Sequence, residues 1–141
     1  MKNKYGATAA GLIKDVSRLY ALRLRIEADN LGIKSSYRPL LTQLYVKDGG
    51  SQLSLSGKTG MKTPTVSITL RKMEKDGLVR RTADEDDLRR VHVYLTDKGR
   101  KITEDLNARI AQINEAFVAG MTEEQKAFFC ESLEKAKEAL K

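Results

Sequence analysis

Two groups of basic and hydroxyl side chains lie close together in the sequence between residues 60 and 100. The first follows Gly60 at helical spacing and comprises Lys62, Thr63, Thr65, Ser67, Ile68, Arg71 and Lys72. The second comprises Arg89 and Arg90, which follow an acidic run at 84–87. Cations and hydroxyls bind phosphates and base edges, and an aliphatic side chain contacts a thymine methyl group. The pattern predicts nucleic-acid binding, with an ordinary solvated helix face as the alternative.

The charge distribution supports this prediction. The chain has 141 residues and a formal net charge of +7. Residues 58–81 hold seven Lys or Arg against two acidic residues, whereas residues 102–141 hold five against eight. A solvated basic surface alone would give such an asymmetry, but here it coincides with the hydroxyl and basic groups. Phosphate binding is therefore the favoured interpretation.

The inventory of reactive side chains argues against an enzyme. His92 is the single histidine and Cys130 the single cysteine. The sequence has no Ser-His-Asp arrangement, usable Cys-His pair, phosphate-binding glycine loop or metal-ligand cluster. We therefore expect no catalytic residue, metal or cofactor, and we place His92 in a strand. Cys130 has no basic residue directly beside it, so a small packed residue is favoured over a redox sensor.

Composition favours one soluble, helix-rich domain. No apolar run approaches the length of a membrane span, and the N-terminus lacks the apolar core of a signal peptide. One cysteine rules out an internal disulfide and is compatible with a reducing compartment. The cytoplasm is the expected location.

Hydrophobic spacing predicts the elements that position the basic groups. Apolar residues recur every three or four positions over 12–24 and predict a first helix, which ends at Gly32. A second helix is expected to be capped by Ser35 or Ser36, with Pro39 in its first turn.

A helix-turn-helix is expected after a break at 48–51. A short third helix over about 53–59 has weak propensity and depends on tertiary contacts. Gly60 then forms the turn, and Lys62 or Thr63 caps a fourth helix. The inward face of this fourth helix is predicted to be Val66, Leu70 and Met73.

A hairpin and two long helices complete the chain. Residues 78–82 and 91–95 predict two strands joined by a loop over 83–90. Thr96 is expected to cap a fifth helix, and residues 122–125 form a capping box for a sixth. The expected fold class is mainly α with a small β-hairpin wing: a winged helix-turn-helix flanked by further helices.

Four motifs occur in order: Pro64-Thr65-Val66-Ser67, Met73-Glu74-Lys75-Asp76-Gly77-Leu78-Val79, Asp87-Leu88-Arg89 and Leu95-Thr96-Asp97-Lys98-Gly99. Together with the element order, they resemble the MarR family of bacterial transcription regulators. The resemblance covers the whole chain by element order and is specific over 60–100. It implies one MarR-type domain over 1–141, with a winged head at about 34–96 and dimerisation helices at about 5–31 and 97–141.

The resemblance also implies a function. MarR proteins are homodimers that bind pseudo-palindromic double-stranded DNA, most often as repressors, and family members bind aromatic or phenolic effectors. By the same resemblance, Asp87 orients Arg89 of the wing through a charge-assisted hydrogen bond, against the alternative of a weak surface ion pair. Ile68, Thr59 and Thr69 depart from the side chains usual in the family, so the operator sequence is not readable from this chain.

The long fifth and sixth helices each carry a row of apolar residues along one face. They support a dimer independently of the resemblance, because one small head cannot bury so much apolar surface. The alternative is that the stripes pack within the chain. The expected interface residues are Leu12, Val16, Ile110, Ile113, Phe117, Phe129 and Leu133.

Three further interpretations stay open. Tyr20, Tyr37 and Tyr45, with Phe117, either line an effector pocket or belong to an ordinary core. A winged-helix protein-interaction module is the main alternative to a DNA-binding protein, although the basic fourth helix argues against it. A redox sensor based on Cys130 is less favoured, because the family's peroxide sensors carry their cysteine near the N-terminus.

Overall fold

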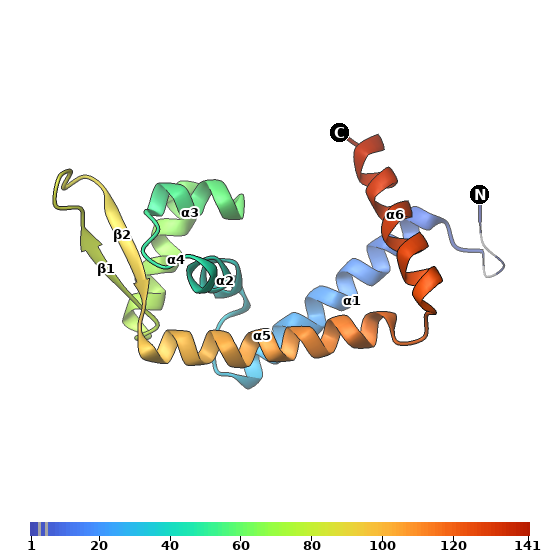
Figure 1. Ribbon diagram of the computed structural model, residues 1–141, viewed down its shortest axis with the longest axis horizontal. Helices are drawn as coiled ribbons and strands as arrows, with labels where there is room; N and C mark the ends of the chain where they lie inside the picture. Colours follow the sequence, from blue (N-terminus) through green and yellow to red (C-terminus); the bar gives the residue numbers. More distant parts are fainter. Residues whose placement is uncertain (3, 5) are drawn as a thin grey trace. The chain divides into compact units, whose positions relative to one another are not determined.

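The computed structural model describes residues 1, 2, 4 and 6–141, and this part of the chain is mainly helical with one antiparallel hairpin (Figure 1). The predicted fold class is confirmed. The chain divides into two compact units, Met1–Arg109 and Ile110–Lys141. The expected division into a head and dimerisation helices is a functional one and stays a prediction. Tyr5, the first residue of the expected N-terminal dimerisation helix, lies outside the described residues.

The first helix ends where the sequence predicts. Helix α1 spans Ala9–Asn30, and the Thr8 side chain caps it by accepting a hydrogen bond from the Gly11 N–H at 3.1 Å. Leu31 is the C-cap, and Gly32 follows it.

The start of the second helix differs from the prediction. Ser35–Tyr37 form a 3-10 turn, η1, and α2 spans Arg38–Val46 with Pro39 in its first turn. No side chain among the described residues caps α2, so the prediction that Ser35 or Ser36 caps it is wrong. The residue before α2 is Tyr37, whose own backbone is helical (φ −76°, ψ −25°), so no extended cap residue precedes the helix.

The helix-turn-helix consists of α3, Gln52–Thr59, and α4, Thr63–Lys75, which pack against each other. Ser51 caps α3 by accepting a hydrogen bond from the Ser54 N–H at 3.1 Å, which stabilises a helix of weak propensity. Gly60 ends α3 in the left-handed region at φ +70°.

Both ends of α4 are defined by backbone geometry. Lys62 is the N-cap, one of the two predicted positions, but without a side-chain bond, because lysine has no acceptor. At the C-terminus Gly77 adopts φ +75°, and the Leu78 N–H donates to the Met73 carbonyl at 2.9 Å. This is a Schellman closure, which uses the glycine as the left-handed residue.

The wing consists of β1, Val79–Ala83, and β2, Val91–Leu95, paired antiparallel from Val79↔Leu95 to Ala83↔Val91. β1 starts and ends one residue later than predicted, because the N–H of Leu78 closes α4. Val93 and Leu95 are buried, whereas His92 on the other face is half-buried.

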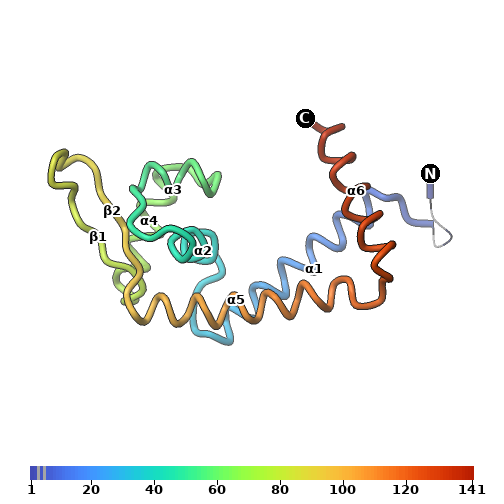
Figure 2. The backbone as a smooth tube through the Cα atoms, in the orientation of Figure 1, coloured from blue at the N-terminus to red at the C-terminus, as the bar shows by residue number. Residues whose placement is uncertain are grey.

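The core of the first unit lies where α2, α3, α4 and the hairpin meet, as the trace in Figure 2 shows. Its fully buried side chains include Tyr37, Leu40, Leu41, Leu44, Leu55, Val66, Leu70, Met73, Leu78 and Val93.

The last two helices begin with the predicted caps. Helix α5 spans Asp97–Val118, and the Thr96 side chain accepts a hydrogen bond from the Gly99 N–H at 3.0 Å. Helix α6 spans Glu123–Ala139, and the predicted capping box between Thr122 and Gln125 is confirmed. None of the helices in the described residues is long and apolar enough to cross a membrane.

Candidate nucleic-acid interface

Helix α4 has one buried and one exposed face. Val66, Leu70 and Met73 retain no exposed surface, as predicted, and Thr69 completes this face by donating to the Thr65 carbonyl at 2.7 Å. Of the candidate contact residues, Ser67 is half-buried, and the exposed ones are Lys62, Thr63, Thr65, Ile68, Arg71 and Lys72. The helix therefore presents hydroxyl, aliphatic and basic groups to solvent.

The helix-turn-helix and the wing together line an open pocket with a volume of about 460 Å³. It is lined by Ser51, Gln52, Leu53, Thr63, Asp87, Arg89, Arg90 and Val91. The start of α3, the start of α4 and the wing arginines thus lie on one surface, although they are well separated in the sequence.

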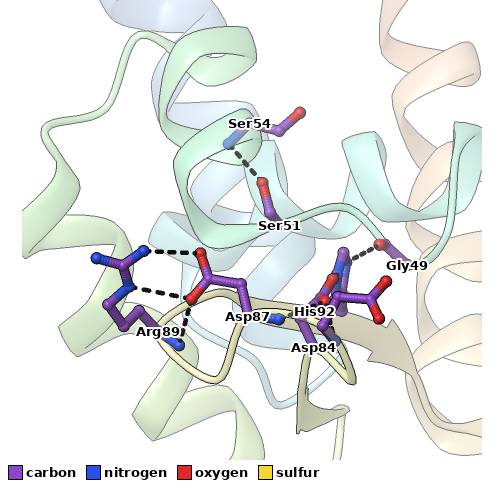
Figure 3. A network of polar contacts seen from close by, with 8 residues as sticks. Gly49, Ser51, Ser54, Asp84, Asp87, Arg89 and His92 are labelled. Atoms are coloured by element: carbon purple, nitrogen blue, oxygen red, sulfur yellow. Dashed lines mark hydrogen bonds and ion pairs between the residues drawn. The ribbon is translucent and has the colours of Figure 1, made fainter.

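Arg89 of the wing is held along one edge and is otherwise free. Its Nε donates to Asp87 Oδ1 at 3.1 Å, its Nη2 to Oδ2 at 3.4 Å, and its backbone N–H to Oδ1 at 3.1 Å (Figure 3). The Arg89 hydrogen bonds lower the pKa of the Asp87 carboxyl. The Arg89 side chain is 92% exposed. The contact that the resemblance implied is present, and its role in binding stays a prediction.

A second polar contact joins the wing to the loop between α2 and α3. His92 Nε2 lies 2.6 Å from Asp84 Oδ2, and His92 Nδ1 lies 3.0 Å from the carbonyl oxygen of Gly49 (Figure 3). The other Asp84 oxygen accepts the backbone N–H groups of Asp86 and Asp87 at 2.8 and 3.0 Å. The carboxylate of Asp84 therefore links the histidine to the wing turn, residues 84–90 between β1 and β2.

These contacts shift both titrating groups toward their charged forms. The hydrogen bond from His92, followed by the two from backbone N–H groups, lowers the pKa of Asp84 to about 2. The Asp84 carboxylate, followed by the Gly49 carbonyl, raises the pKa of His92.

His92 lies in a strand, as predicted, but its contact with Asp84 was not predicted. The signal was present in the hairpin register: the Asp84 N–H donates to the Arg90 carbonyl at 2.8 Å, one pair beyond Ala83↔Val91. Residues 84 and 92 are then diagonal neighbours on one face of the hairpin.

The base of the wing is tied to the helix-turn-helix by Arg81. Its Nη2 donates to Glu74 Oε1 of α4 at 3.0 Å, and its Nη1 to Gln52 Oε1 of α3 at 3.4 Å. The hydrogen bond from Arg81 lowers the pKa of Glu74. This bridge orients the hairpin relative to the exposed face of α4.

The three candidate pocket tyrosines lie in different surroundings. Tyr37 is buried in the core, and its hydroxyl donates to Asp76 Oδ2 at 2.7 Å. Tyr45 is 36% exposed and lies beneath the guanidinium of Arg100, 5.7 Å from the ring centroid. Tyr20 is half-buried. Tyr37 has the surroundings of an ordinary core residue, and an effector site stays a prediction.

The expected interface residues differ in exposure. In the first unit Leu12 and Val16 are exposed on α1. In the second unit Phe117 and Leu133 are exposed, and the rings of Phe117 and Phe129 pack with centroids 5.9 Å apart. Ile113 is only 7% exposed and Ile110 is half-buried. Ile113 therefore has little surface left to offer a second copy.

Two kinds of reactive site remain to be placed in the structure, the single cysteine and any group of side chains that could hold a metal ion. Cys130 is exposed, so the interpretation of a packed residue is wrong for this chain. Its position on α6 faces solvent rather than an apolar core. In the described part of the chain, no group of three or more His, Cys, Asp or Glu side chains is arranged to hold a metal ion.

A helix-turn-helix followed by an arginine-bearing hairpin defines a winged helix-turn-helix protein. The family model "MarR family" matches residues 39–91, which cover α2 from its second residue, α3, α4, β1 and the wing turn. The chain is 26% identical over 117 residues to YwoH of Bacillus subtilis, described as an uncharacterised HTH-type transcriptional regulator. That match spans 83% of this chain and 85% of YwoH.

Solved structures give the same result. A MarR transcriptional regulator from Methanosarcina mazei Go1 is 29% identical, with a TM-score of 0.78 over 91% of this chain and 92% of that one. A mutant of Staphylococcus aureus MepR bound to an oligodeoxyribonucleotide is 26% identical, with a TM-score of 0.64 over 96% and 99% of the two chains. The chain is thus similar in sequence and fold to MarR-family proteins, and it is a transcription regulator.

Proposed function

We propose that the protein is a cytoplasmic homodimeric repressor that binds a pseudo-palindromic double-stranded DNA operator through α4 and the wing. An aromatic or phenolic effector would release it from the operator. In a dimer, two copies of α4 would enter successive major grooves, with half-sites about one helical turn apart.

One observation carries this proposal. The face of α4 opposite the core exposes Thr65, Ile68, Arg71 and Lys72, beside a wing whose Arg89 is almost fully solvent-accessible. Hydroxyl and basic groups on a helix of major-groove size, next to an arginine that reaches a minor groove, provide both base and phosphate contacts. The MepR mutant of similar fold, which is bound to an oligodeoxyribonucleotide, supports the same use of this face.

The test begins with selection of bound fragments from random duplex DNA, followed by fluorescence anisotropy with the selected fragment at two salt concentrations. We expect a twofold-symmetric site and a steep loss of affinity with salt, because several phosphates are contacted per head. Arg71→Ala should weaken binding. Lys135→Ala removes an equal charge from α6, where Lys135 pairs with Glu131, and should bind like the parent.

Binding that is insensitive to salt, or equal for Arg71→Ala and Lys135→Ala, would refute the DNA interface and favour a protein-interaction module. The effector part is tested separately by adding phenolic acids to the preformed complex. An operator complex that persists at saturating concentrations of such acids would contradict it.

A further inference from the structure

The ring of His92 contacts two groups that both accept hydrogen bonds. Nδ1 faces the carbonyl oxygen of Gly49 at 3.0 Å, and Nε2 faces the carboxylate of Asp84 at 2.6 Å. A carbonyl has no proton to donate, and the Asp84 carboxyl is ionised because its pKa is about 2. A neutral imidazole carries one N–H, whereas an imidazolium carries two. Only the protonated ring makes both contacts.

Asp84 continues the connection into the wing turn. Its Oδ1 accepts the N–H groups of Asp86 and Asp87, and the carboxylate of Asp87 holds the guanidinium and the N–H of Arg89. One series of contacts, which passes through the backbone N–H of Asp87, thus runs from the Gly49 carbonyl through His92, Asp84 and Asp87 to Arg89 (Figure 3).

The loop at one end of this series is held in place, whereas the Arg89 side chain at the other end is exposed to solvent. The loop end is fixed by backbone hydrogen bonds, from the Gly49 N–H to the Val93 carbonyl and from the Val93 N–H to the Gly50 carbonyl, both at 2.9 Å. At the other end the Arg89 side chain is 92% exposed. Loss of the Asp84 contact therefore removes the side-chain link from the wing turn to β2, and loss of the Gly49 contact removes the direct link from the ring to the loop.

We propose that protonated His92 positions Arg89 for DNA contact by connecting the wing turn to the loop between α2 and α3, so that DNA affinity falls when His92 loses its proton. His92 acts here as a positioning residue and not as a DNA contact. The effect on affinity rests on the function proposed above, because it concerns binding by α4 and the wing.

The charged groups around the ring act in both directions. Asp84 favours the protonated ring and Arg90 opposes it, while the backbone N–H groups of Asp86 and Asp87 lower the pKa of Asp84 and keep its carboxylate charged. On the loop side, the carboxylate of Asp48 is bound by a backbone N–H of β2 and by an arginine of α5. The β1 residue opposite His92 in the register is an uncharged threonine.

The direction in which DNA affinity changes with pH follows from the direction of the pKa shift of His92. The pKa of His92 is raised above its ordinary value of 6.5 by Asp84 and the Gly49 carbonyl. The connection is therefore complete below that ordinary value, and it is lost as pH rises through the raised pKa. Affinity should be higher at the acidic end and lower at the alkaline end.

The first experiment needs no DNA. Because the chain has one histidine, imidazole signals in an NMR titration from pH 5.5 to 8.5 belong to His92 without ambiguity. We expect the ring to lose a proton with a midpoint above about 6.5, and the amide signals of Asp86 and Asp87 to follow the same midpoint. Asp84→Asn should lower the midpoint, because an amide replaces the carboxylate. A ring that stays neutral throughout, or turn amides that do not follow it, would overturn the connection.

The second experiment measures affinity for the selected operator over the same pH range. The affinity of the parent for the operator should fall roughly three- to tenfold as pH rises, which is the effect of losing about one net hydrogen bond. His92→Gln should show weak, pH-independent binding. Cys130→Ser changes an exposed side chain on α6, away from the wing in the sequence, and should keep the parent's pH step.

The outcomes separate the two proposals. A parent that binds operator with no pH step, or a His92→Gln variant that copies the parent's step, overturns the inference while the proposed function stands. A parent that binds no duplex at any pH overturns the proposed function and the affinity effect, and the NMR titration still decides whether His92 positions the wing turn.

Discussion

A Cβ atom on Gly99 would lie 2.0 Å from the carbonyl oxygen of Leu78. That oxygen accepts a hydrogen bond from the Thr96 N–H at 3.0 Å, and the Thr96 hydroxyl donates to the Gly77 carbonyl at 2.6 Å. The first turn of α5 therefore rests directly on the junction between α4 and β1. Glycine at 99 is required for this close approach, because the opposing atom is backbone.

Gly99→Ala should lower stability, because the helix start must move away from the wing junction. Forcing a methyl group into such a site costs about 1–3 kcal/mol or more. Thermal and urea unfolding measure the loss. Gly57→Ala is the matched control: no atom lies within 4 Å of its Cβ, and alanine should stabilise the interior of α3 by about 0.5–1 kcal/mol. Equal stability of the two variants would contradict the close approach.

Tyr37→Phe should destabilise the first unit by about 0.5–1.5 kcal/mol, the net value of one hydrogen bond. The Tyr37 hydroxyl donates to Asp76 at 2.7 Å from a buried ring. Tyr45→Phe removes the same atom from an exposed ring, 3.5 Å from Glu104, and should have little effect. Urea unfolding of both variants decides whether the Tyr37 contact is structural.

The same hydroxyl predicts an alkaline dependence of stability. Burial, followed by the hydrogen bond to Asp76, raises the pKa of Tyr37 from 10 to about 12. Its contribution is complete below pH 10 and is lost as pH rises through about 12. The free energy of unfolding of the parent should therefore fall more steeply above pH 10 than that of Tyr37→Phe. Parallel curves would show that the hydroxyl is not buried against Asp76.

Arg89→Ala should weaken binding to operator and to random duplex alike, by about 1–3 kcal/mol, with a shallower salt slope. The wing arginine would read groove width and phosphate rather than base identity. Asp87→Ala should reproduce part of this loss, since the arginine remains but loses its three contacts with that carboxylate. Anisotropy at two salt concentrations compares the variants. An Arg89→Ala protein that binds both duplexes like the parent would exclude a DNA role for the wing.

Substitutions on α4 should act differently from those on the wing. Ser67→Ala and Arg71→Ala should change the sequence preference if these residues contact base edges, because each such contact discriminates by about 1–3 kcal/mol. Repeating the selection from random duplex with each variant shows which positions of the site lose their preference. Unchanged preferences with uniformly weaker binding would make these residues phosphate contacts.

Leu133→Glu should split the proposed dimer, because a carboxylate placed against an apolar surface costs several kcal/mol. Leu133 is 37% exposed in the chain, so its substitution leaves the protomer's own packing largely intact. Ile113→Glu should instead unfold its surroundings, since Ile113 is already buried. Lys135→Glu on the same helix is the control and should stay dimeric in sedimentation. A monomeric parent at micromolar concentration would contradict the dimer itself.

Local chemistry made most of the elements predictable. The buried face of α4, the break at Gly60, the capping box of α6 and the hairpin alternation all follow from spacing and turn residues that act over a few positions. One error occurred where neighbouring elements compete for one backbone group: the N–H of Leu78 closes α4, so β1 begins one residue later.

The sequence by itself determined the element order, the basic exposed face of α4 and the arginines of the wing, because these depend on residue type and period. Only the tertiary structure decided how the wing is attached. The bonds from His92 to Gly49 and from Arg81 to Gln52 join residues 43 and 29 positions apart. Such partners are brought together by the packing of α2, α3 and the hairpin around one core, and no local pattern in the chain encodes that approach.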